Sequence, residues 1–90
     1  METGLCDLAE LTGDEAQKLT GQGPLDQFSD IAVVMVEDYG LHLHQGIAKV
    51  RRMICHDLRG AMRSGNIDEA RLLLATLREF VIEYPEAART

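Results

Sequence analysis

Apolar and basic residues occupy two different faces along residues 47–63. The apolar positions recur at steps of three and four, as on one side of a helix: Ile47, Val50, Ile54, Leu58 and Ala61. Basic residues and one histidine recur at the same steps: Lys49, Arg52, His56, Arg59 and Arg63. At about 100° per residue, the two sets lie on nearly opposite sides of a helix. The pattern predicts one face in a core and one positively charged face outside it.

A helix stop and a helix start follow directly. Gly65 suits the left-handed position that ends a helix. Asn66 suits the N-cap of the next helix, where Glu69 completes a capping box.

The next helix carries its own apolar stripe, and Pro85 ends it at or near Tyr84. The stripe consists of Ile67, Ala70, Leu74, Leu77, Val81 and Tyr84, widened by Leu73 and Phe80. Because the connection is short, we predict that residues 47–63 and 67–84 form an antiparallel helical hairpin.

Residues 31–46 fit two structures. The β-branched run of residues 31–36 and the period-two run of residues 41–44 suit a strand hairpin. A helix also fits, because apolar residues step by three and four directly into the following stripe: Phe28, Ala32, Val36, Tyr39, Leu43 and Ile47. We favour a long or kinked helix, with Gly40 or Gly46 marking a kink, an end or a close helix crossing.

The N-terminal quarter is acidic and less regular. Thr12 and Glu15 fit a capping box that starts a short helix to about Leu19, and residues 21–24 then break the chain. An ordered lid and a mobile arm both fit this segment. The predicted division is an acidic N-terminal segment, a helical domain and a tail: residues 1–23, 24–85 and 86–90.

The composition favours packed helices in one domain. Apolar residues make up 46% of the 90 residues and aromatic residues only 4%, so the core must be mainly aliphatic. The apolar stripes on residues 28–61 and 67–84 exceed what a contact between two helices covers. We therefore predict an all-α fold that completes a bundle by dimerisation.

The net charge of −6 is unevenly distributed. Residues 1–45 carry nine acids and one base, whereas residues 46–90 carry eight bases and six acids. Two alternatives follow. The basic face pairs with acidic residues of the same chain or of a second copy, or it binds an external anion. Nucleic acid is a poor candidate, because the chain is acidic overall and no aromatic residue lies among the bases.

Cysteine use and hydropathy favour the cytosol. Cys6 and Cys55 form no C-x-x-C motif and no disulfide framework. The first residues lack the basic and apolar regions of a signal peptide, and the longest apolar run, Ile31–Val36, is too short for a membrane span.

His56 lies in the run His56-Asp57-Leu58-Arg59-Gly60, which has the form His-x-x-basic-Gly. This run resembles the phosphoacceptor motif of histidine phosphotransfer domains and, less closely, the His-box of histidine kinases. The resemblance implies that His56 accepts a phosphoryl group, that Arg59 steadies it, and that Gly60 leaves room for a receiver domain.

No metal or cofactor is expected. On a helix, His42 and His44 point to different sides, and on a strand two histidines alone make an incomplete site. No serine triad and no glycine-rich phosphate loop occurs in the sequence.

The sequence therefore predicts a non-enzymatic protein interaction module, such as an adaptor, chaperone-like or regulatory protein. Its partner-binding residues are those of the basic stripe: Lys49, Arg52, His56, Arg59 and Arg63. The alternatives are a phosphorelay protein that uses His56 and a structural subunit of a larger assembly.

Overall fold

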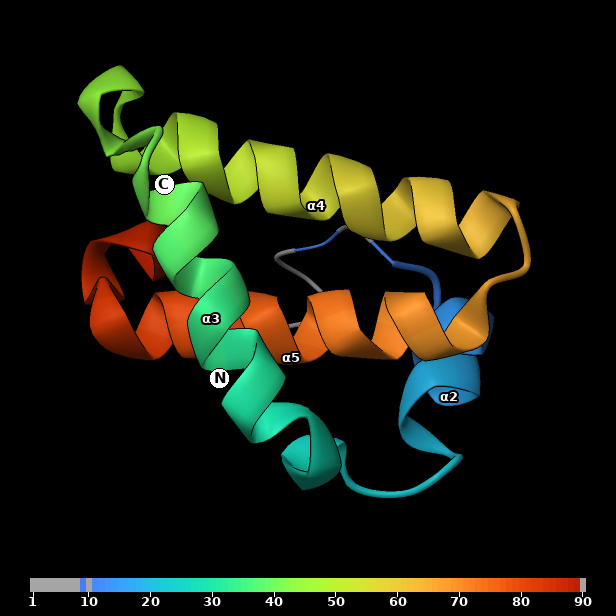
Figure 1. The fold of residues 1–90 in the computed structure, drawn as a ribbon. Coiled ribbons are helices and arrows are strands. Elements are labelled where there is room, and N and C mark those ends of the chain that lie inside the picture. Colours follow the sequence, from blue (N-terminus) through green and yellow to red (C-terminus); the bar gives the residue numbers. More distant parts are fainter. Residues whose placement is uncertain (1–8, 10, 90) are drawn as a thin grey trace.

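The computed structural model describes residues 9 and 11–89, and all of its regular elements are helical (Figure 1). The α-helices are α2 (Gly13–Thr20), α3 (Ser29–Gly40), α4 (Ile47–Arg63) and α5 (Ile67–Glu83). Short 3₁₀ helices join or follow them: η1 (Leu25–Phe28), η2 (Leu43–Gln45) and η3 (Pro85–Arg89). The described residues contain no strand, so the all-α prediction is confirmed and the strand alternative for residues 31–46 is wrong.

Helix α5 is the centre of the fold. In Figure 1, α4 runs antiparallel beside α5, α3 crosses α5, and α2 lies near the N-terminal end of α5. Side chains around most of the α5 circumference are buried: Ala70, Arg71, Leu73, Leu74, Ala75, Thr76, Leu77 and Phe80. A helix buried on nearly all sides needs neighbours on all sides, and here the same chain supplies them.

The apolar spacing that continues from residue 28 to residue 61 is divided between two helices. Helix α3 ends at Gly40, and α4 begins after Gly46. Gly46 has φ = 102°, a left-handed conformation that glycine adopts without a steric penalty. The chain therefore turns between the two helices, and α3 crosses α5 instead of extending α4 (Figure 1).

The turn between α4 and α5 satisfies the backbone at both helix ends. Gly65 has φ = 77°, and the backbone N–H groups of Gly65 and Asn66 donate to the carbonyls of Met62 and Ala61 at 3.1 and 3.0 Å. The Asn66 side chain accepts from the N–H of Glu69 at 3.2 Å, as predicted for an N-cap. The Glu69 carboxylate does not complete a capping box with the backbone, because the N–H of Asn66 is already bonded. It accepts from the Asn66 side-chain amide instead, at 3.1 Å.

The capping box at the start of α2 is confirmed. The Thr12 N–H donates to the Glu15 carboxylate at 3.0 Å, and the Glu15 N–H donates to the Thr12 hydroxyl at 3.2 Å. Leu19, near the end of α2, is completely buried.

A buried arginine holds the segment after α2 against α5. The Arg71 side chain donates to the carbonyls of Leu19 at 3.0 Å, Gly23 at 2.9 Å and Pro24 at 3.2 Å. Its guanidinium carbon lies 5.4 Å from the centre of the Phe28 ring. These contacts join residues 19–24 to α5.

At the other end of α5, residues 85–89 form η3, and Ala87 is completely buried. Most of the segment predicted as a tail is therefore helical. Within the described residues, no helix combines the length and the apolar character that crossing a bilayer requires.

Candidate partner-binding surface

The basic stripe lies on the outer face of α4. Val50, Ile54 and Leu58 on the opposite face are completely buried, so the predicted amphipathic division of this helix is confirmed. All members of the basic stripe are exposed: Lys49, Arg52, His56, Arg59 and Arg63. The helix period places these side chains within about four turns of one another on a single face.

One residue of the basic stripe, Arg59, interacts with an acid of the same chain. Glu15 of α2 lies within electrostatic range of Arg59. The pKa of Glu15 is lowered, first by the hydrogen bond from the Thr12 backbone and, more weakly, by the Arg59 charge. Within the described part of the chain, Lys49, Arg52 and Arg63 form no ion pair. These three cations are therefore available to an external anion.

Two shallow hollows flank His56. One, of about 410 Å³, is lined by Lys49, Arg52, Met53, His56 and Asp57. It combines two cations and the imidazole with the apolar surface of Met53. Its composition suits a carboxylate or a phosphate group at the centre of the basic stripe.

The other hollow, of about 310 Å³, lies between α3, α4 and α5 and is less suited to an anion. Its lining includes Tyr39, His56, Asp57, Gly60 and Glu69. The Tyr39 hydroxyl donates to the Asp57 carboxylate. Burial, this hydrogen bond and the charges of Asp57 and Glu69 all raise the pKa of the Tyr39 hydroxyl above its ordinary value.

Gly60, four residues after His56, is exposed, and a Cβ placed there would meet no described atom within 4 Å. His56 and Gly60 therefore lie on an accessible part of α4.

The remaining histidines and the described cysteine form no site. The Gln45 side-chain amide lies 3.3 Å from His42 Nδ1, and His44 is exposed. No cluster of potential metal ligands occurs among the described residues. Cys55 is buried beside the apolar face of α4, whereas Cys6 lies outside the described residues.

The specific contacts of three residues were not predicted from the sequence. Arg71 and the Tyr39–Asp57 pair join segments that are far apart in the chain, and helical periodicity alone does not report such contacts. The only available signal for Arg71 was its position at the edge of an apolar stripe.

No protein-family model, no curated protein and no solved structure gives a significant match to this chain.

Proposed function

We propose that this chain is a non-enzymatic helical docking module that binds an acidic protein surface through the basic stripe on α4. An adaptor, a chaperone-like protein or a regulatory protein would act in this way. The main support is that Lys49, Arg52 and Arg63 are exposed and form no ion pair with any described residue. One exposed ion pair contributes only about 0–1 kcal/mol, but several on one face steer and orient a partner.

Charge reversal tests this proposal on the partner that co-purifies with the chain from its native host. Arg52→Glu together with Arg63→Glu should slow association about tenfold or more, because complementary charge mainly accelerates encounter. Stopped-flow or biosensor kinetics with the isolated partner would measure the association rate.

Lys18→Glu is the control for a single charge reversal and is compared with Arg52→Glu alone, since Lys18 is an exposed cation on α2 and not part of the stripe on α4. It should leave the rate within about twofold, because an isolated surface charge contributes little. Equal effects of the stripe variants and the control, or none at all, would place the docking surface elsewhere.

A second candidate function is phosphotransfer through His56, favoured by the exposure of His56 and the open space at Gly60. An imidazole nitrogen would attack the phosphorus of an acyl phosphate, and the carboxylate would leave as the bond from phosphorus to its oxygen breaks. Incubation with acetyl phosphate and intact-mass analysis test this function. Modification that is lost in His56→Gln supports it, and an unmodified chain excludes it.

The third possibility is a structural subunit of a larger assembly, in which the N-terminal segment would lie on a neighbouring subunit. Self-association also stays a prediction, as does a cytosolic location. A constant stoichiometry in the co-purified complex would favour the structural role. Exchange of the chain between complexes would favour a docking module.

A further inference from the structure

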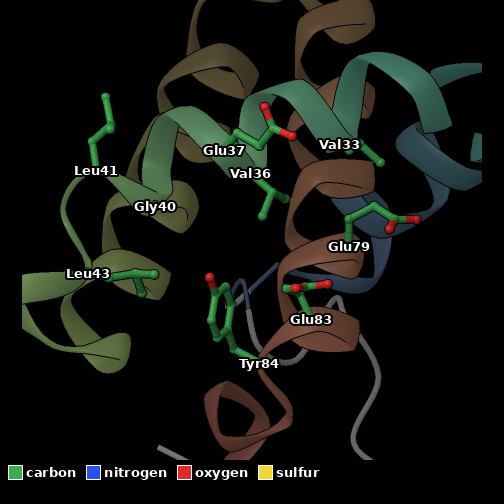
Figure 2. A pocket seen from close by; sticks show the side chains of 9 residues that line it. All are labelled: Val33, Val36, Glu37, Gly40, Leu41, Leu43, Glu79, Glu83 and Tyr84. Atoms are coloured by element: carbon green, nitrogen blue, oxygen red, sulfur yellow. The ribbon is translucent and has the colours of Figure 1, made fainter.

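A second surface, which is acidic and apolar where the basic stripe is cationic, lies between α3 and the C-terminal half of α5. It is a groove of about 400 Å³, which we term the acidic groove (Figure 2). Its lining includes an apolar floor and three carboxylates: Val36, Leu43, Tyr84, Glu37, Glu79 and Glu83. None of the described residues that line it is a lysine, an arginine or a histidine.

The rim of the acidic groove leaves apolar side chains in water. Leu41 is 75% exposed and Val33 is 47% exposed, and both line the groove. Figure 2 shows Leu41 and Val33 at opposite ends of the α3 side, with Glu37 between them. A ligand that covers this rim would bury apolar surface, and this burial favours binding.

Glu79 and Glu83 stand at positions of α5 where negative charge is unfavourable for the helix. Glu79 and Glu83 are four residues apart on α5, where like charges repel. They also lie near the C-terminal end of α5, whose dipole favours cations, and the last turn of α5 contains no base. Local helix stability therefore does not explain these two carboxylates, whereas a cationic ligand would.

The basic stripe of a second copy would not fill this groove. The large exposed apolar side chains among the described residues lie on α3, directly after α3, and on α5: Ile31, Val33, Val34, Leu41 and Ile82. None lies on α4, where the half-buried Met53 alone adds apolar surface to the hollow beside His56, so the basic stripe could pair with the three carboxylates but would leave most of the apolar floor uncovered. The groove requires a ligand that carries both kinds of group.

We infer that the acidic groove binds a cationic amphipathic segment of a partner protein, which places apolar side chains on Val36, Leu43 and Tyr84 and lysines or arginines beside Glu37, Glu79 and Glu83. This inference is independent of the basic stripe, which takes a partner of the opposite charge. The chain then presents two docking surfaces of opposite charge on different helices.

The probe for this inference is a synthetic helical peptide with leucines on one face and lysines on the other, labelled with a fluorophore. Fluorescence anisotropy should show saturable binding to the full chain. Two control peptides carry glutamates in place of the lysines or serines in place of the leucines. Each should bind at least about tenfold more weakly than the probe. Each control peptide removes one of the two groups that the groove requires.

Two charge-matched variants distinguish the groove from diffuse attraction to an acidic protein. Glu79→Gln with Glu83→Gln should weaken probe binding about three- to twentyfold, as expected for two lost charge pairs. Asp14→Asn with Asp68→Asn removes the same charge at exposed positions on α2 and α5, and should change the affinity less than about twofold. Equal weakening by both variants would mean that the probe reports only the net charge, and would overturn the inference.

Gly40→Leu tests the groove without changing any charge. Gly40 lines the groove, and a Cβ there would lie in ordinary contact with Leu43 at 3.9 Å, so the variant should fold. Its longer side chain should occupy the groove and abolish probe binding. Unchanged binding by this variant, with a circular dichroism spectrum like that of the wild type, would overturn the inference.

Two further measurements distinguish binding at the acidic groove from docking at the basic stripe and from self-association. Arg52→Glu should retain full probe binding, because Arg52 does not line the groove. The groove variants should likewise leave binding of the acidic partner to the basic stripe unchanged. Each proposal can therefore be contradicted without affecting the other. Sedimentation velocity would show whether the groove variants change self-association. If they change it and leave probe binding unchanged, the occupant of the groove is a second copy of this chain. That result would contradict the inference.

Discussion

At the scale of single residues, the Arg71 guanidinium is the least expected feature of the core. Arg71 is only 4% exposed, and it donates to carbonyls of Leu19, Gly23 and Pro24. A buried cation is costly unless hydrogen bonds replace its hydration. Arg71 is therefore stabilised by its backbone partners, and they in turn depend on it for satisfied hydrogen bonds.

Replacing this side chain should be strongly destabilising. Arg71→Met leaves three carbonyls without their donor and should lower the free energy of unfolding by about 2–4 kcal/mol. Urea unfolding followed by circular dichroism would measure the loss.

Arg78→Met is a control on the same helix, two turns further along. The Arg78 side chain is 30% exposed and lies 3.5 Å from an Asp26 carboxylate that is itself 80% exposed. Its replacement should cost less than about 1 kcal/mol. Similar losses for both variants would show that Arg71 contributes only as a surface charge does.

The sequence could predict which α4 residues point outward, because a 3.6-residue period is a local property. It could not predict the burial of Arg71. This residue lies at the edge of an apolar stripe, where a solvated arginine fits equally well, and the decisive carbonyls are about fifty residues away. The same holds for the acidic groove, whose carboxylates come from α3 and α5.

At the scale of elements, Tyr39 joins α3 to α4. Its hydroxyl donates to Asp57, and burial together with this bond raises the pKa of Tyr39. The folded chain thus holds the phenol proton to a higher pH than the unfolded chain, in which the pKa is about 10. The contribution of Tyr39 is complete below that value and is lost as the pH rises above it.

Tyr39→Phe should therefore have two effects. At neutral pH it should lower the free energy of unfolding by about 0.5–1.5 kcal/mol, because one hydrogen bond is lost. Above about pH 10 the wild type should lose stability faster than the variant, because only the wild type must give up this proton on unfolding. Urea unfolding of both proteins at several pH values provides the test, and parallel curves would contradict it.

The existence of α4 and α5, the turn at Gly65 and the Asn66 N-cap could be predicted, since glycine, asparagine and proline signals are local. The path of α3 could not. Its apolar spacing continues into α4 in phase, and only the conformation of Gly46 shows that the two helices separate. A pattern in one dimension does not distinguish a kinked helix from two helices joined by a turn.

At the scale of the whole molecule, the chain covers most of its own core. The radius of gyration is 12.1 Å, close to the roughly 12 Å expected for a compact domain of this length. The apolar stripes that favoured dimerisation are covered largely by the packing of α3 and α4 against α5, and further by α2 and the 3₁₀ helices. Among the exposed apolar residues, Ile31 and Val34 on α3 and Ile82 on α5 lie outside the acidic groove.

Self-association through Ile31 and Val34 should therefore be weak and should increase with salt. A two-fold interface here would bring Asp30 and Asp38 of α3 near their copies, and salt screens such repulsion. Sedimentation velocity at several protein and salt concentrations would measure it. Val34→Lys should abolish association, and a chain that is monomeric under all conditions would exclude the predicted dimer.

The Arg71 contacts also have a consequence for biosynthesis. Leu19 and Arg71 are 52 positions apart, and a ribosome adds about 5–20 residues per second. The nascent N-terminal segment thus waits about 3–10 s for the side chain that anchors it. During translation, residues 19–24 are open to chaperones and proteases, and they gain their protection only when α5 emerges.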